Sequence, residues 1–193
     1  EESLSNGGLI TLDDMASYKA KYREPIEIDY RGYRIVSMGP AASGGLVLLQ
    51  TLNILENFNL KETGHNSAVT VHLLSEAMQR AFADRAVFHG DPDYYDVPVE
   101  KSLSKEYAKE RAQTIGELRV KDGEIFAGNL KNYDESPDTT HYSIIDSEGN
   151  AVSNTYTLGS SFGSGVTVKK GGFLMNNQMR NFSHFYGQEG KEY

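Results

Sequence analysis

The chain has 193 residues, of which 38% are hydrophobic and 24% charged, so it can bury a substantial core as one domain or a large part of one. A formal charge of −8 argues against a nucleic-acid surface, which would show clustered Lys and Arg. Cysteine is absent, which excludes disulfides, thiolate metal sites and cysteine nucleophiles, and no apolar run approaches the roughly 20 residues of a membrane helix.

The first part of the chain predicts two helices with a hairpin between them. Thr11 is the expected N-cap of a short helix, and residues 25–36 alternate in the manner of two strands. A loop containing Gly44 and Gly45 then precedes a helix over 46–58. No G-x-G-x-x-G or Walker pattern accompanies these glycines. We therefore favour a structural loop, in which glycine lets two backbones pass close together, rather than a phosphate-binding site.

A longer helix is predicted from Asn66 or Ser67, as its N-cap, to about Phe88. His72 within it is expected to be a packed or capping side chain. The apolar spacing predicts one face made of Leu74, Met78, Ala81 and Phe82.

The acidic turn Asp91-Pro92-Asp93 follows this helix and resembles the start of a calcium loop. The sixth-position glycine and twelfth-position glutamate of such a loop are missing, because Asp96 and Ser102 stand there. We therefore predict a solvated turn and no metal site.

The remaining chain changes from helix to strand. Ser104 caps a predicted helix over 104–115, and the segment 116–138 loses apolar periodicity and is predicted to be a surface linker in which a cut is tolerated. Helices followed by strands indicate an α+β fold whose sheet is built around a hairpin. The predicted strands are 139–146, 150–158, about 166–168 and 172–176.

The hairpin turn sets which residues face one another. Gly149 stands where a three-residue loop needs a left-handed residue, so Asp146 should pair with Asn150 and Thr139 should face Thr157. Directly opposed side chains lie on the same face, about 5 Å apart at Cβ. A slip of one residue would put the two threonines on opposite faces.

Thr139 is a candidate nucleophile. A threonine hydroxyl needs an adjacent base, and its own α-amino group supplies one if the bond after Asp138 is cut. A second hydroxyl from Thr157 could orient this amine and hydroxyl. Strand propensity alone also explains threonines in this pattern, so the spacing leaves both interpretations open.

Motifs along the whole chain resemble the γ-glutamyltranspeptidase family. The later ones are Thr139-Thr140-His141-Tyr142-Ser143, Gly149-Asn150-Ala151-Val152, Thr155-Tyr156-Thr157-Leu158, Phe162-Gly163 and Asn176-Asn177-Gln178-Met179. The earlier ones are Gly8-Leu9-Ile10-Thr11, Tyr30-Arg31-Gly32-Tyr33, Ser43-Gly44-Gly45, Ala83-Asp84-Arg85 and Gly90-Asp91-Pro92-Asp93.

This resemblance implies an N-terminal nucleophile hydrolase with a four-layer αββα architecture, of which the chain is an incomplete part. Residues 1–138 would be the C-terminal part of the large-subunit region, mostly helical and ending in a surface linker. Residues 139–193 would be the N-terminal part of the small-subunit region, mostly strands. Both subunits would come from one precursor that is cut between Asp138 and Thr139.

By the same resemblance, Thr139 is the nucleophile, Thr157 supports it, and Gln178 helps to hold the α-amino group of a γ-glutamyl substrate. The acyl group would pass to water or to an amino acid, with no cofactor. The family's arginine for the substrate carboxylate would lie before Glu1, and its serine pair and oxyanion-hole glycines after Tyr193.

The substrate-gripping end departs from the family pattern. Gly159 stands where the family usually has Asn, and Arg180-Asn181 replaces an Asp-Asp pair. A hydrogen bond to a charged group is worth about 1.5 to 3 kcal/mol, so losing a carboxylate should weaken the binding of a free α-amino group. A glutaryl substrate, as in the family's cephalosporin acylase-like branch, is then an alternative. Equally open is that Arg180 and Asn181 are ordinary loop residues and another side chain grips the amine.

An alternative of another class is an unprocessed, non-catalytic relative that acts as a binding module. The compartment stays undecided, because the resemblance fits a periplasmic or secreted protein and the composition fits a cytoplasmic one as well.

Overall fold

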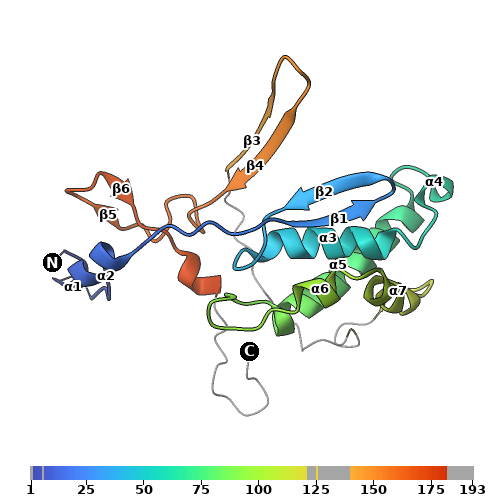
Figure 1. Ribbon diagram of the computed structural model, residues 1–193, viewed down its shortest axis with the longest axis horizontal. Coiled ribbons are helices and arrows are strands. Elements are labelled where there is room, and N and C mark those ends of the chain that lie inside the picture. Colours follow the sequence, from blue (N-terminus) through green and yellow to red (C-terminus); the bar gives the residue numbers. More distant parts are fainter. Residues whose placement is uncertain (1, 6, 121–124, 126–139, 182–193) are drawn as a thin grey trace, which may run out of the picture. The chain divides into compact units, whose positions relative to one another are not determined.

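The computed structural model describes residues 2–5, 7–120, 125 and 140–181 (Figure 1). The chain divides into two compact units. One is Lys21–Lys131, and the other combines Glu1–Ala20 with Asn132–Tyr193. Each unit has its own secondary structure and is described by itself.

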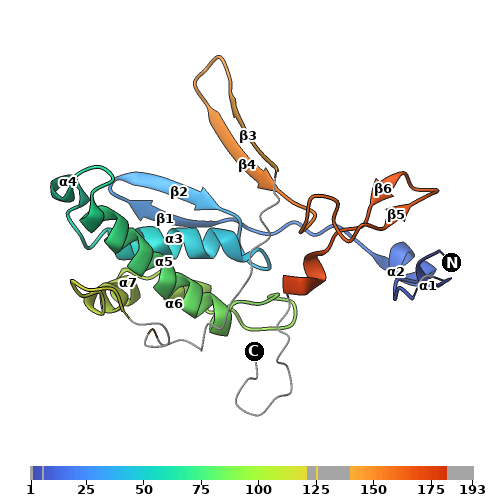
Figure 2. The ribbon, with the colours of Figure 1, turned by 180° about the vertical axis from the view of Figure 1, so that it is seen from behind.

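The unit Lys21–Lys131 is built around helix α3 (Ser43–Leu55). The antiparallel hairpin of β1 (Ile26–Tyr30) and β2 (Tyr33–Ser37) lies along one side of α3, and the long helix α5 (Ala68–Phe88) packs on another (Figures 1 and 2). Helix α7 (Lys105–Gln113) contacts both α3 and α5. The short helices α4 (Leu60–Thr63) and α6 (Val99–Ser102) connect these elements. None of the helices in the described ranges could cross a membrane.

The core of this unit lies between α3, α5 and α7. Leu46, Leu49 and Ile54 of α3 are fully buried, as are Ala77 of α5 and Ala108 of α7. The small alanines let the three helices approach one another closely, and the larger side chains of α3 fill the space between them.

Helix α3 begins and ends three residues earlier than the sequence predicts. Gly45 lies in its first turn, where a Cβ atom would stand 2.0 Å from the carbonyl oxygen of Met38. Only glycine fits this approach, which confirms the prediction of a close backbone passage. At the other end, the amide of Phe58 donates to the carbonyl of Leu55 at 3.1 Å. This i to i−3 bond tightens the chain into a turn, so Phe58 lies outside the helix.

Helix α5 confirms the predicted bounds but not the predicted apolar face. Ser67 is the N-cap and accepts the amide of Thr70 at 3.1 Å. Of the predicted face only Ala81 is buried, while Leu74 is 43% and Met78 41% exposed. The buried side chains of α5 are Leu73, Glu76, Ala77, Arg80, Ala81, Ala83 and Asp84.

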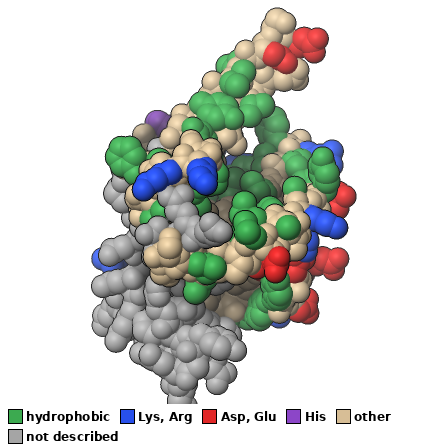
Figure 3. All heavy atoms as spheres, turned by 90° about the vertical axis from the view of Figure 1, so that its left-hand side faces the viewer, with side chains coloured by type: hydrophobic (Ala, Val, Ile, Leu, Met, Phe, Trp, Pro, Cys, Tyr) green, Lys and Arg blue, Asp and Glu red, His purple; other side chains and the backbone are tan. Residues whose placement is uncertain are grey.

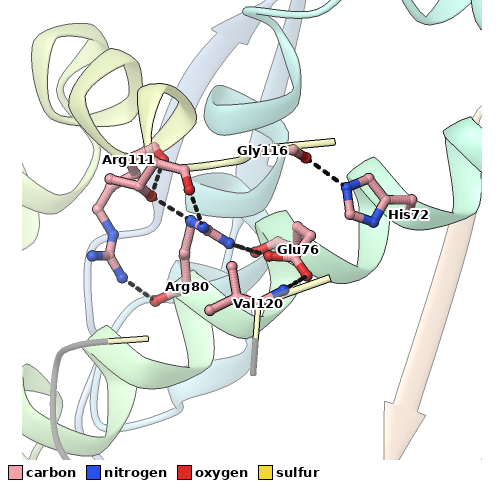
Figure 4. A network of polar contacts seen from close by, with 7 residues as sticks. His72, Glu76, Arg80, Arg111, Gly116 and Val120 are labelled. Atoms are coloured by element: carbon pink, nitrogen blue, oxygen red, sulfur yellow. Dashed lines mark hydrogen bonds and ion pairs between the residues drawn. The ribbon is translucent and has the colours of Figure 1, made fainter. Parts of the chain in front are cut away.

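Charged side chains are buried on α5 because each has partners on other segments. Arg80 donates to the carboxylate of Glu76 at 2.7 Å, and to the hydroxyl and carbonyl oxygens of Thr114, both at 2.6 Å (Figure 4). The other carboxylate oxygen of Glu76 accepts the amide of Val120 at 3.2 Å. One turn earlier, His72 contacts the carbonyl of Gly116 at 2.8 Å, as expected of a packed or capping histidine.

A second buried carboxylate, Asp84, ties three helices together. Its side chain accepts from Gln50 of α3 and from the hydroxyl of Tyr107 of α7 at 2.9 Å, and Arg111 lies 3.1 Å away. Burial raises the pKa of Asp84, whereas Arg111 and the two donors oppose this rise. Burial, with the nearby Asp84 charge, also raises the pKa of Tyr107 to about 12.

The second unit begins with α1 (Glu2–Ser5) and α2 (Leu12–Ser17). Thr11 is the N-cap of α2, as predicted, and forms a reciprocal capping box with Asp14. The strands are β3 (Thr140–Ile145), β4 (Ala151–Tyr156), β5 (Thr167–Val168) and β6 (Phe173–Leu174), followed by the 3-10 helix η1 (Gln178–Asn181).

The sequence predicts one sheet built around the hairpin, but the described strands of this unit form two separate pairs. Among the described residues β3 pairs only with β4, and β5 only with β6. Tight turns after β4 redirect the chain, with the amide of Gly163 donating to Ser160 and that of Gly165 to Phe162, both at 2.9 Å. The short strands that follow therefore pair with each other instead of extending the β3–β4 ladder.

Candidate active site

The β3–β4 hairpin has the register that the sequence predicts. Thr140 pairs with Tyr156, and Ile145 pairs with Ala151. Beyond these pairs the amide of Asp146 donates to the carbonyl of Asn150 at 3.0 Å, so the loop is the expected three residues, 147–149.

The turn is held by the side chain of Asp146. One of its carboxylate oxygens accepts the amides of Glu148 and Asn150, both at 2.9 Å, and the other accepts the side-chain amide of Asn150 at 2.8 Å. These donors, Asn150 first, lower the pKa of Asp146. Gly149 has a φ of 87°, the left-handed conformation expected of it. The turn fixes the register through contacts made within five residues.

Thr157 follows the last described pair of the hairpin. Its hydroxyl oxygen accepts the amide of Gly159 at 3.0 Å, and its carbonyl accepts the side-chain amide of Gln178 at 3.3 Å. Thr139 and Asp138 lie outside the described residues. The placement of Thr139 opposite Thr157 therefore stays a prediction, which extends the observed register by one pair.

Gly159 lies where two segments of the unit cross. The amide of Asn177 donates to the carbonyl of Leu158 at 2.6 Å, and its side chain contacts Ser160 at 3.4 Å. Gly159 is buried with a φ of +90°, and a Cβ atom there would stand 3.0 Å from the carbonyl carbon of Asn177. A side chain at 159 would therefore crowd the backbone of Asn177 and would have to keep a φ that favours glycine.

The crossing brings together three of the residues named from the sequence: Thr157, Gly159 and Gln178. The backbone amide of Gln178 donates to the side-chain oxygen of Asn176 at 2.9 Å, and this bond fixes the start of η1. The backbone of Arg180 and Asn181 continues this short helix, while their side chains lie outside the described part of the chain.

A row of polar side chains to which the sequence pattern assigned no role lies on the Thr157 face of the hairpin. His141 bonds through Nδ1 to the hydroxyl of Thr155 at 2.7 Å and through Nε2 to that of Ser153 at 3.0 Å. Ser143 lies 3.5 Å from the same Nε2. The signal was present in the sequence, because residues 139, 141 and 143 alternate onto one face of a strand.

The acidic turn after α5 is held by cations of its own unit. Asp93 contacts Lys21 at 2.6 Å and Arg23 at 2.9 Å, and Asp91 contacts Arg23 at 3.3 Å. Lys21 and then Arg23 lower the pKa of Asp93. Within the ranges that the structure covers, no group of His, Asp and Glu side chains could hold a metal ion.

Known proteins resemble this chain along nearly its whole length. The family model described as gamma-glutamyltranspeptidase matches residues 1–193. The chain is 48% identical to a glutathione hydrolase proenzyme of Escherichia coli and 41% identical to the acylase ACY 1 proenzyme of a Pseudomonas species. Each match covers 95% of this chain and 32% of the relative.

A solved structure gives the same result. A cephalosporin acylase from Bacillus halodurans matches with a TM-score of 0.72 and 35% identity, over 94% of this chain and 31% of that one. The chain thus spans about a third of the length of the relatives that it matches.

Proposed function

The chain belongs to the γ-glutamyltranspeptidase family, and we propose that it is part of a self-processing threonine amidohydrolase and acyltransferase that cleaves γ-glutamyl amide bonds. The fold is the α+β, N-terminal nucleophile hydrolase type of its structural relatives, of which this chain matches a part. The observation that supports the proposal is the register of β3 and β4, which ends at Thr140 and Tyr156, because one further pair in the same register would set Thr139 opposite Thr157.

Self-cutting is the first reaction that this proposed placement would allow. The hydroxyl oxygen of Thr139 attacks the carbonyl carbon of Asp138, and the acyl group moves from the threonine nitrogen to its oxygen. That move breaks the C–N bond and frees the α-amino group of Thr139, and water then hydrolyses the ester, which restores the hydroxyl of Thr139 and releases the carboxylate of Asp138. Residues 1–138 then belong to the large subunit and residues 139–193 to the small one.

Turnover uses the same oxygen with the new amine as its base. An α-amino group has a pKa near 8, so near neutral pH a useful fraction is unprotonated and accepts the proton of the attacking hydroxyl. The attack forms an acyl-enzyme and releases the amine of the substrate. Water or the amino group of an amino acid then takes the acyl group. Thr157 orients the Thr139 groups, and Gln178 lies beside Thr157 to meet the substrate.

A glutaryl substrate is a second candidate, favoured by the crossing at Gly159. A side chain at this position would crowd the backbone of Asn177, glycine itself supplies no side-chain amide, and residue 181 carries a neutral amide. Fewer groups are then available to grip an α-ammonium. The similarity to both glutathione hydrolase and acylase proenzymes accommodates either substrate class.

The test is the mass of the purified full-length protein that contains this chain. We expect two polypeptides, with the smaller one beginning at Thr139. Thr139→Ala should give one uncut polypeptide and no turnover, whereas Thr140→Ala, the same change on the opposite face, should still cut. An uncut wild-type protein after long incubation would favour the non-catalytic binding module.

Substrate class is decided by comparing hydrolysis of γ-glutamyl and glutaryl anilides by the processed protein. A preference for the γ-glutamyl anilide supports the transpeptidase. A preference for the glutaryl anilide supports the acylase.

A further inference from the structure

The two faces of the β3–β4 hairpin differ in chemistry. The face opposite Thr157 carries Tyr142, Ile144, Val152 and Tyr156, and the Tyr142 and Tyr156 rings meet edge to face at 6.4 Å. These apolar side chains are exposed along the hairpin (Figure 3). The Thr157 face instead carries the imidazole and hydroxyl groups of residues 141, 143, 153 and 155.

His141 joins the two strands on this polar face. It contacts Thr155, which is directly opposite, and Ser153, which is the diagonal neighbour. Both ring nitrogens are thereby engaged. A neutral imidazole has one donor and one acceptor nitrogen, and a hydroxyl can take either role, so both bonds can be satisfied at once.

The His141–Thr155 contact lies two residues along each strand from Thr139 and Thr157, the proposed catalytic pair. Thr155 precedes Thr157 by two positions on the same face, and His141 follows Thr139 by two. A two-stranded hairpin is marginal without further contacts, and a slip of one residue would turn Thr157 away from Thr139. At the turn end Asp146 holds the register, and toward the open end the side-chain hydrogen bonds of His141 link the two strands on the Thr157 face, as the Tyr142–Tyr156 contact does on the other face.

We propose that His141 is a positioning residue which, through Thr155 and Ser153, holds the open end of the hairpin so that residue 139 faces Thr157. This inference rests on the proposed function, since it assigns His141 a role in presenting the Thr139 nucleophile. We assign His141 a positioning role because both of its ring nitrogens contact hydroxyls of the facing strand, at Thr155 and Ser153.

The test uses the full-length precursor and measures the rate of self-cutting and then kcat and KM. Thr155→Val replaces the hydroxyl by a methyl of the same shape, and Thr155→Ser keeps the hydroxyl. Loss of one neutral hydrogen bond should lower the cutting rate and kcat by about 3- to 10-fold with KM changed less than about twofold. Thr155→Ser should keep at least about half of both rates.

Substitutions of His141 distinguish the contribution of its contact with Thr155 from that of its contact with Ser153. His141→Asn can still reach Thr155 from the position of Nδ1, so it should retain more activity than His141→Phe. In the double variant His141→Phe/Thr155→Val the losses should not add, because both changes remove the same His141–Thr155 contact, and the double variant should behave like His141→Phe alone. The matched control is Thr167→Val in β5, which makes the same atomic change away from the hairpin and should leave kcat unaltered.

Two outcomes overturn the inference. One is a Thr155→Val protein with unchanged cutting rate and kcat, and the other is full additivity in the double variant. Thr139→Ala in the same assay keeps the two proposals apart. If it still cuts, the proposed function fails; if it is inert while the His141 and Thr155 variants behave as wild type, only this inference fails.

Discussion

Replacing Gly159 by Ala adds one methyl group at the point where residues 157–160 cross the segment 176–178. The new Cβ atom would stand 3.0 Å from the carbonyl carbon of Asn177, 3.1 Å from its oxygen and 3.3 Å from its Cβ. The residue would also have to keep a φ of +90°. The substitution therefore combines backbone strain with crowding against a backbone that the crossing holds in place.

The two costs can be separated with a second glycine. A left-handed conformation costs a non-glycine residue about 1–2 kcal/mol, and crowding in a packed site typically costs a further ~1–3 kcal/mol. Gly165 has a φ of +75°, and a Cβ there would meet no atom within 4 Å. Gly165→Ala should therefore bear only the conformational cost. The free energy of unfolding of Gly159→Ala should then be lower than that of Gly165→Ala by the crowding cost, about 1–3 kcal/mol.

Gly159→Ala should also lower the catalytic rate. The amide of Gly159 donates to the hydroxyl of Thr157 at 3.0 Å, so a shift at 159 moves the group that is proposed to orient Thr139. We expect kcat to fall by about 3- to 10-fold in Gly159→Ala and to stay near wild type in Gly165→Ala. Urea unfolding and steady-state kinetics of the processed protein measure both effects. Equal unfolding midpoints, or an unchanged kcat in Gly159→Ala, would refute the reasoning.

Two further predictions concern the helical unit. Arg80→Ala leaves the buried Glu76 carboxylate without its cation and should lower the free energy of unfolding by about 3–5 kcal/mol, whereas Arg34→Ala, which breaks an exposed pair with Glu27, should change it little. Similar losses in urea unfolding of the two variants would contradict this. Burial, and then the charge of Arg85, lowers the pKa of His89 from 6.5 to about 4. Between these values the unfolded chain binds a proton that the folded chain does not, so stability should fall as pH falls through this window and level off below it. Comparing unfolding midpoints at the two ends of the window, His89→Asn should lose less than wild type; parallel losses would show that His89 is not responsible.

The sequence alone determined the features that depend on contacts within a few residues. The N-caps Thr11, Ser67 and Ser104 lie at the predicted positions, because a cap bonds to amides three residues away. The hairpin register followed from Asp146 and Gly149 for the same reason. The pairing that supports Thr139 as nucleophile is thus predictable from the residues of the turn.

Only the tertiary structure decided which faces are buried and which distant segments meet. Apolar spacing predicted the wrong face of α5, because Glu76, Arg80 and Asp84 are stable in the interior once segments more than twenty residues away supply their partners. The contact of Gln178 with Thr157, and the lack of room at Gly159, arise where the chain crosses itself. Periodicity reports the character of a residue but not its long-range partners, and it is those partners that determine whether a charge is buried or a methyl group fits.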